Sequence, residues 1–182
     1  MQDQLYTFPI CQFVGFKGSG KTTLMNTFIS QYEKIGKRVG TIKHHGHGGR
    51  PDAVEGTDSF LHMTSGATVS SVAGEDIVQL TINDEHFAIN DLIKMYEQLS
   101  VDVLLIEGYK EASFPKIVLV RDETDLQLVK QLNNIIAVGV WDDELMNDIS
   151  NYYTFNIHHI DKNLHQLFDY ITVKLTESIN LT

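Results

Sequence analysis

Short apolar runs alternate with longer amphipathic stretches along this chain. The runs are rich in β-branched residues and lie at residues 9–14, 38–43, 101–106, 116–120 and 135–140. Runs of this kind are typical of strands buried in a parallel sheet, and helical patterns between them are typical of βαβ units. The pattern therefore predicts an α/β fold, in which a mostly parallel sheet is flanked by helices.

Two stretches have the apolar spacing of amphipathic helices. The first is predicted to open within a glycine-rich loop and to run to about Ile35, where Gly36 ends it. Its inward side chains are expected to be Leu24, Phe28 and Ile35. The second is predicted over residues 162–175, where five apolar side chains fall on one face: Leu164, Leu167, Phe168, Ile171 and Leu175.

A β-hairpin is predicted near residues 67–82. Two short runs, residues 67–73 and 77–82, flank Gly74-Glu75-Asp76, which has the composition of a tight turn. We expect the hairpin to extend the fold, with its strands at the edge of the sheet.

Length and composition fit one globular domain over residues 1–182. The chain is long enough for one sizeable core and short for two domains. Hydrophobic residues make up 42% and charged residues 21%, which is ordinary globular usage. No repeat or linker-like tract marks a domain boundary.

Charge and cysteine content narrow the class of protein. A formal net charge of −10 argues against general nucleic-acid binding, because that affinity comes largely from clustered Lys and Arg. The single cysteine, Cys11, cannot form an intramolecular disulfide, and no apolar stretch approaches the ~20 residues needed to cross a bilayer. We predict a cytoplasmic protein with no nucleic-acid partner and no membrane anchor.

The clearest chemical motif is a phosphate-binding loop. The run Gly15-Phe16-Lys17-Gly18-Ser19-Gly20-Lys21-Thr22 satisfies G-x-x-x-x-G-K-[ST], with a predicted strand before it and a helix after it. Its glycines permit a tight turn whose backbone N–H groups surround a phosphate. Lys21 is expected to reach the β- and γ-phosphates and the Thr22 hydroxyl to bind Mg²⁺. The sequence therefore predicts a P-loop NTPase-like nucleotide-binding domain.

A second acidic element is expected at the end of a neighbouring strand, where it holds the metal or its water. Glu107 follows the apolar run 103–106, at the carboxyl edge where open α/β sheets bind ligands. Asp102, at the other end of that run, is the weaker candidate. Gly108 is expected to let the backbone approach the γ-phosphate. The alternative is that this glycine serves only to form a turn.

A loop rich in histidine and glycine follows the second predicted strand. It begins Lys43-His44-His45-Gly46-His47, and we expect a switch loop near the γ-phosphate in which Lys43 and His44 contact the nucleotide. The alternatives are a solvated loop and a transition-metal site, although no cysteine is at hand to complete such a site. Asp58, further along, is either an N-terminal residue of the next helix or a partner of Mg²⁺.

Taken together, four segments resemble the MobB family, which takes part in molybdopterin-guanine dinucleotide biosynthesis. They are residues 15–24, 40–45, 56–59 with 65–67, and 105–110, in the family's order. The glycine loop is shared by many NTPases, whereas the Ile-Lys-His and Glu-Gly-Tyr-Lys pieces are far more specific. The first segment adds Thr23 to the expected nucleotide contacts.

The resemblance implies a GTP-binding homodimer that assists the guanylyltransferase joining GMP to molybdopterin. It implies weak, Mg²⁺-dependent GTP hydrolysis at most. By analogy, Lys110 and Lys116 face the nucleotide or a partner. The preference for guanine rests on the resemblance alone, because the chain contains no Asn-Lys-x-Asp run.

Three other functions share parts of the pattern. An ATP-dependent small-molecule kinase or ligase of the dethiobiotin-synthetase kind has a similar strand-end Glu-Gly element, but it needs several arginines, and this chain has only Arg38, Arg50 and Arg121. A nickel-insertion GTPase binds its metal through cysteine as well as histidine ligands, and the single cysteine of this chain, Cys11, is in the wrong place for such a site. The last is an adaptor that binds nucleotide without useful catalysis, because no residue stands out as a water-orienting base or an arginine finger.

Overall fold

The computed structural model describes residues 6–46 and 55–180 of the chain. These residues form two compact units, the first from within 1–44 and 96–182 and the second from within 45–95. That the whole chain is a single domain stays a prediction.

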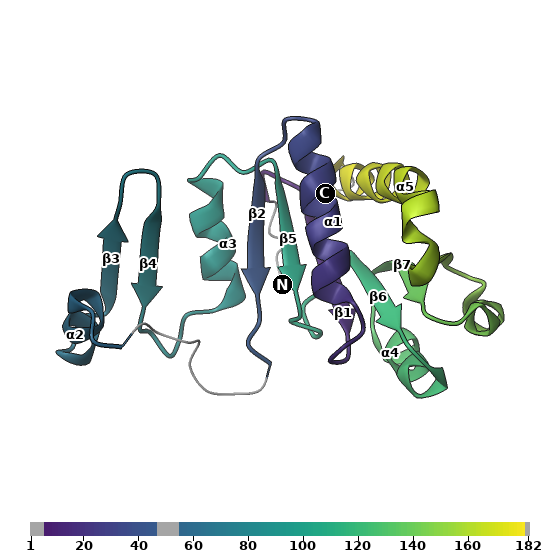
Figure 1. Cartoon of the computed structure of the whole chain (residues 1–182), viewed down its shortest axis with the longest axis horizontal. Coiled ribbons are helices and arrows are strands. Elements are labelled where there is room, and N and C mark those ends of the chain that lie inside the picture. The colour runs from purple at the N-terminus through teal and green to yellow at the C-terminus, as the bar shows by residue number, and fades with distance from the viewer. Residues whose placement is uncertain (1–5, 47–54, 181–182) are drawn as a thin grey trace. The chain divides into compact units, whose positions relative to one another are not determined.

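The first unit centres on a six-stranded sheet in the order β2-β5-β1-β6-β7-β8 (Figure 1). All pairings between these strands are parallel. The strands are β1 (Ile10–Gly15), β2 (Val39–Lys43), β5 (Val103–Glu107), β6 (Lys116–Val120), β7 (Ile135–Val140) and β8 (Tyr153–Asn156). The predicted α/β class is confirmed, and the five predicted strands are present.

Helices cover both faces of this sheet. On one face lie α1 (Lys21–Lys34) and α5 (Ile160–Asn180), and on the other lie α4 (Leu126–Gln131) and two 3₁₀ helices, η1 (Glu123–Asp125) and η2 (Asp143–Ile149). A third 3₁₀ helix, η3 (Ile157–His159), leads into α5.

Strand β6 shows how alternate side chains serve both faces. Ile117 and Leu119 join the core under α1 and α5, whereas Val118 and Val120 join the core under α4 and η2. This two-sided burial is why β6 is continuously apolar after Lys116.

The C-terminal end of α1 differs from the sequence prediction. Gly36 ends the helix in a left-handed conformation (φ 72°), as expected. The inward placement of Ile35 is wrong, since its side chain is 58% exposed. The helix ends at Lys34, so the backbone at Ile35 has already left the helical path, and Tyr32 instead completes the buried stripe.

The second unit contains α2 (Asp58–Thr64), β3 (Val69–Ala73), β4 (Val78–Ile82) and most of α3 (Ile89–Glu97). The predicted hairpin is confirmed as an antiparallel β3–β4 pair. Its predicted place at the edge of the large sheet is wrong, because β3 and β4 form a two-stranded sheet of their own and β2, at the edge of the large sheet, pairs with β5.

None of the helices in the described part of the chain combines the length and the apolar character needed to span a bilayer.

Candidate functional site

The loop between β1 and α1 has the backbone of a phosphate-binding loop. Gly18 and Gly20 adopt left-handed conformations, with φ of 78° and 90°. Gly15 is required for a different reason, since a Cβ there would collide with Ser19 Oγ and lie 2.9 Å from the Leu119 carbonyl oxygen. The predicted loop glycines are therefore dictated by conformation and by close packing.

The N-terminus of α1 is open to an anion. Gly20 is its N-cap, no side chain of the described residues caps it, and its first turn contains no acidic residue. Lys21, Thr22 and Thr23 make up that turn. The free N–H groups and the helix dipole there favour bound phosphate.

Lys21 spans the loop that precedes it. Its Nζ donates a hydrogen bond of 2.7 Å to the Phe16 carbonyl oxygen. Partial burial lowers the pKa of Lys21, and the nearby Glu107 carboxylate opposes that shift by raising it. An ammonium held in this way is available to a phosphate oxygen at little conformational cost.

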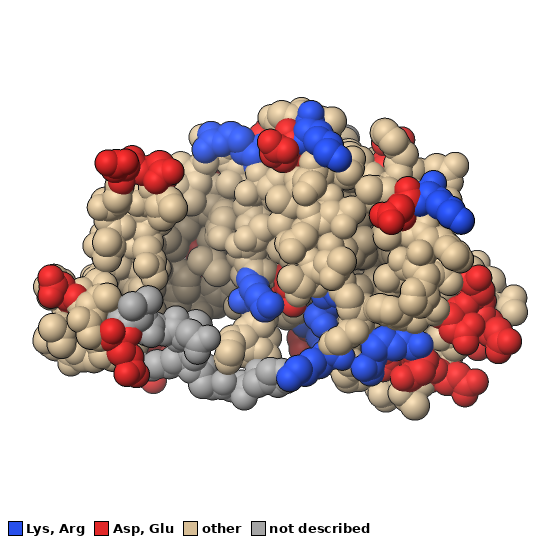
Figure 2. All heavy atoms as spheres, in the orientation of Figure 1, with Lys and Arg blue, Asp and Glu red and all other residues tan. Residues whose placement is uncertain are grey.

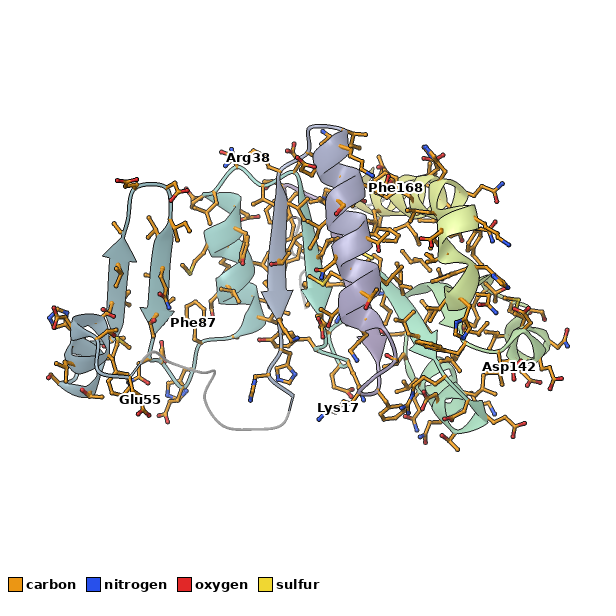
Figure 3. The ribbon with its side chains drawn as sticks, viewed as in Figure 1. Lys17, Arg38, Glu55, Phe87, Asp142 and Phe168 are labelled. Carbon is orange, nitrogen blue, oxygen red and sulfur yellow. The ribbon has the colours of Figure 1, made fainter. Side chains whose placement is uncertain are left out.

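Further cations surround Lys21. Three of them lower its pKa by electrostatic repulsion: Lys110, Lys43 and Arg121. Figure 2 shows Lys and Arg side chains gathered at one edge of the molecule, and Figure 3 labels Lys17 at that edge. A chain with a formal net charge of −10 thus presents a locally positive site, as a polyphosphate ligand needs.

Thr22 and Glu107 meet at the carboxyl edge of the sheet. The Thr22 hydroxyl donates a hydrogen bond of 2.9 Å to Glu107 Oε2, and Lys43 Nζ lies 3.5 Å from Glu107 Oε1. The structure therefore brings together two of the predicted metal ligands and one predicted nucleotide contact. A hydroxyl and a carboxylate are the oxygen donors that Mg²⁺ prefers, so the pair fits that ion.

The two aspartates considered with Glu107 lie elsewhere. Asp102 accepts a hydrogen bond of 2.7 Å from the backbone N–H of Arg38, which Figure 3 labels at the opposite edge of the sheet from Lys17. Asp58 belongs to the second unit, where it is the first residue of α2 after the Thr57 N-cap. Its role as a magnesium ligand stays a prediction.

The loops after β2 and β5 run side by side. The His44 N–H donates to the Glu107 carbonyl oxygen at 2.9 Å, and the rings of His44 and Tyr109 lie 4.5 Å apart. Gly108 has a φ of 95°, and a Cβ there would lie 2.9 Å from His44 Cβ. The predicted contacts His44 and Gly108 therefore share one short stretch of surface beside Glu107.

The metal-binding alternative for the histidine loop falls partly on residues outside the described ones, because these exclude His47. Within residues 6–46 and 55–180, no three His, Cys, Asp or Glu side chains come together as a metal site.

The two lysines assigned by analogy have different environments. Lys110 Nζ lies 4.3 Å from the centroid of the Phe16 ring, at the phosphate loop. Lys116 is fully buried, and its Nζ donates to backbone carbonyls within the protein. The expectation that Lys116 faces the nucleotide or a partner is wrong, because no part of it reaches the surface.

Arg121 contacts the phosphate loop, although the sequence analysis assigned it no role there. Its Nη1 donates a hydrogen bond of 3.1 Å to the Lys17 carbonyl oxygen. The buried Asp125 carboxylate holds the same guanidinium at Nε (2.9 Å) and Nη2 (3.2 Å). Arg121 directly follows β6, and this position after a predicted strand is the signal that could have placed it at this edge.

Trp141 is the second missed residue. Its indole Nε1 donates a hydrogen bond of 3.1 Å to the Ser19 carbonyl oxygen. A Cβ at Gly20 would lie 3.5 Å from the indole ring. The ring also meets His158 edge-on at 4.8 Å. Trp141 directly follows β7, so the same strand-end rule identifies it.

Sequence comparison identifies the family of the chain. The sequence model of the family described as molybdopterin guanine dinucleotide synthesis protein B matches residues 10–141. A Bacillus subtilis (strain 168) protein described as a probable molybdopterin-guanine dinucleotide biosynthesis adapter protein is 41% identical over 132 residues, or 72% of this chain and 75% of that protein. A Haemophilus influenzae protein described as a molybdopterin-guanine dinucleotide biosynthesis adapter protein is 30% identical over 132 residues, or 72% and 74%.

Solved structures agree as well. The crystal structure of Bacillus subtilis MobB is similar with a TM-score of 0.78 at 34% identity, covering 92% of this chain and 98% of that one. That of a MobB homologue from Bacillus stearothermophilus gives a TM-score of 0.69 at 30% identity, covering 90% and 98%. The chain belongs to the MobB family, the molybdopterin-guanine dinucleotide biosynthesis adapter proteins.

Proposed function

We propose that this chain is a GTP-binding adapter that assists the guanylyltransferase of molybdopterin-guanine dinucleotide biosynthesis. The observation that carries the proposal is the hydrogen bond between Thr22 and Glu107 beside an uncapped, cation-rich phosphate loop. It joins the two sequence elements that a Mg²⁺-nucleotide site needs, one from the first turn of α1 and one from the end of β5.

The protein's own groups bind the nucleotide in this account. Backbone N–H groups from Gly15 to Thr23 and the α1 N-terminus receive the phosphates. Lys21 exchanges its bond to the Phe16 carbonyl for a phosphate oxygen. Thr22 and Glu107 would hold Mg²⁺, which neutralises charge on the β- and γ-phosphates when it is bound. Lys43, beside Glu107, adds a further cation at the γ end.

Hydrolysis by the isolated protein is slow in this account. Arg121 is the described arginine at the loop, and all three of its guanidinium nitrogens are engaged, with Asp125 and with the Lys17 carbonyl. An arginine that stabilises the transition state is worth about 10³–10⁵ in rate. Since Arg121 serves the loop instead, the protein is at most a weak Mg²⁺-dependent GTPase.

The family supports a protein partner. The relatives from Bacillus subtilis and Haemophilus influenzae are described as adapter proteins, so this chain's effect is expected on another protein. The enzyme that consumes GTP in the same biosynthesis is the partner we propose, in the cytoplasm.

We further propose that two copies associate through the β3–β4 hairpin. The strand register puts Val69, Val78 and Leu80 on one face of the hairpin, and they are 54%, 70% and 45% exposed. An isolated two-stranded hairpin is marginally stable in water, and an exposed apolar face of this kind is typical of a surface that packs against a partner. The resemblance implies a homodimer, so we propose that a second copy of the chain packs against this face. Light scattering should give a dimer for the wild type and a monomer for Leu80→Lys, and a monomeric wild type would contradict the proposal.

Titration of the purified protein with GTP, ATP and GDP, with and without Mg²⁺, tests the binding site, the metal and the base together. We expect GTP to bind more tightly with Mg²⁺ and more tightly than ATP. Absence of binding by any triphosphate would overturn the proposal, and equal affinity for ATP would overturn the guanine preference alone.

A further inference from the structure

The connection between β5 and β6, residues 108–115, carries Lys110 to the phosphate loop. We call this connection the strap. It leaves β5 through two successive left-handed residues, Gly108 (φ 95°) and Tyr109 (φ 51°). A left-handed conformation is unfavourable for a residue such as tyrosine, and it persists only where the surroundings fix it.

Gln12 fixes this end of the strap. Its side chain is fully buried in the middle of β1. The amide Nε2 donates to the Gly108 carbonyl oxygen at 3.0 Å and to the Tyr109 carbonyl oxygen at 2.8 Å. One side chain thus holds both left-handed residues. A primary amide inside an otherwise apolar strand is costly to bury, and these two bonds satisfy its N–H donors, whereas its Oε1 has no hydrogen-bond partner among the described residues.

Lys116 fixes the other end. It is aligned with Gln12 across the β1–β6 pair and is likewise fully buried. Its Nζ donates to three backbone carbonyl oxygens, those of Ala112 (3.0 Å), Phe114 (2.9 Å) and Asn133 (2.9 Å). The three donors of an ammonium are therefore all used, two of them on the strap.

We propose that Gln12 and Lys116 are positioning residues, which together hold the strap so that its Lys110 lies at the phosphate loop as a cation for the bound nucleotide. The inference rests on the proposed nucleotide-binding function. Two fully buried polar side chains on adjacent strands bind the two ends of one connection. Between those ends, Lys110 lies over the Phe16 ring of the loop at 4.3 Å.

A purely structural role for Gln12 predicts a different pattern from a positioning role. If Gln12 acts through Lys110, removing Lys110 has little further effect once Gln12 has been changed. If Gln12 only stabilises the fold, the two effects on affinity are independent and multiply.

The test is a double-mutant cycle on affinity for GTP with Mg²⁺, using Gln12→Met, Lys110→Ala and both together. Methionine keeps the length of the side chain and removes the amide. We expect each single variant to bind about fivefold more weakly, as for the loss of about 1 kcal/mol of hydrogen bonding or charge contact. The double variant should bind no more than about twofold more weakly than Gln12→Met alone. A product of the single effects, about 25-fold, would overturn the proposal.

Two controls separate positioning from general damage. Lys34→Ala removes an exposed lysine from the other end of α1 and should leave the affinity and the cycle unchanged. Ile117→Val trims a fully buried side chain next to Lys116 and should lower stability without coupling to Lys110. Coupling between Ile117→Val and Lys110→Ala would also overturn the proposal.

A nucleotide-free measurement keeps this inference separate from the proposed function. In the ligand-free protein, Gln12→Met should speed amide hydrogen exchange in residues 108–115 more than in β6 and β7, and Lys116→Met should do the same if it folds. Unchanged exchange in the strap of Gln12→Met would overturn the inference even if GTP binds. If the wild type binds no nucleotide, the proposed function fails and so does the assigned role of Lys110, while exchange still decides whether Gln12 holds the strap.

Discussion

The Thr22 hydroxyl donates a hydrogen bond of 2.9 Å to the Glu107 carboxylate, although the two residues are 85 positions apart. Thr22 lies in the first turn of α1, and Glu107 ends β5, which pairs directly with β1. The parallel pairing of these strands is what puts both side chains at the carboxyl edge of the sheet. The relationship therefore depends on topology, and it places a hydroxyl and a carboxylate next to the phosphate loop.

Glu107→Gln tests this pair. The substitution keeps the shape of the side chain and removes its charge, so Mg²⁺ should enhance GTP binding much less than in the wild type. Binding of the bare nucleotide should be retained. Asp102→Asn, at the opposite edge of the sheet, is the matched control and should leave the Mg²⁺ effect intact. If Glu107→Gln keeps the full Mg²⁺ effect, the role moves to Asp58.

Lys21→Ala tests the charge contact with the phosphates. Loss of a charged hydrogen bond should weaken binding of GTP by about 2–3 kcal/mol. The circular dichroism spectrum should stay the same, since the Lys21 side chain donates one hydrogen bond within the described part of the chain, to the Phe16 carbonyl oxygen. Unchanged affinity in a folded variant would remove Lys21 from the site.

The pH dependence of nucleotide binding should report on Lys21. Burial lowers its pKa below the ordinary value of 10.5, so without metal the affinity should fall as the pH rises through that lowered pKa. Glu107 raises the pKa of Lys21, and Glu107→Gln should therefore shift the fall to lower pH. Lys110 lowers the pKa of Lys21, so Lys110→Ala should shift the fall to higher pH. Three superimposable pH profiles would contradict this electrostatic account.

Trp141 provides an optical test, because it is the single tryptophan of the chain and bonds to the loop at the Ser19 carbonyl oxygen. Nucleotide binding should change its fluorescence emission. Trp141→Phe keeps an aromatic ring and removes the N–H donor, and it should weaken GTP binding by about two- to tenfold, as for one neutral hydrogen bond. Tyr153→Phe, on β8, is the control and should have no effect. Constant emission during saturating binding would show that Trp141 does not sense the site.

The sheet and the phosphate loop were predictable because each depends on residues that are close together in the sequence. The buried strands are continuous apolar runs, and β6 shows why, since its side chains enter a core on each face. The left-handed glycines of the loop follow from backbone sterics alone, as at Gly18 and Gly20.

The missed elements and the misplaced Ile35 have different causes. Strand β8 has only four residues and lies at the edge of the sheet, so its sequence lacks a buried apolar run. Helix α3 does have apolar spacing at Ile89, Ile93 and Tyr96, which a search for the helical period would have found. Ile35 fits the same period and is nevertheless exposed, because the helix ends one residue before it.

Strand ends place Arg121 and Trp141 at this edge of the sheet, but their contacts with the loop were beyond the local pattern. Arg121 and Trp141 reach it from the ends of β6 and β7, and this depends on the order of strands in the sheet. Gln12 and Lys116 fasten the strap through backbone carbonyls, which carry no residue-type signal. Sequence therefore predicts the residues of the candidate phosphate site, whereas the groups that hold them in place follow from the assembled sheet.

The most direct test of the account is the rate at which the guanylyltransferase forms molybdopterin-guanine dinucleotide at limiting GTP. The rate should be measured without this chain, with the wild type and with Lys21→Ala. If the chain is a GTP-binding adapter for that enzyme, the wild type should raise the rate, Lys21→Ala should fail to do so, and the wild type should co-elute with the enzyme. Equal rates in all three conditions, with no co-elution, would contradict the adapter function and point to an independent activity.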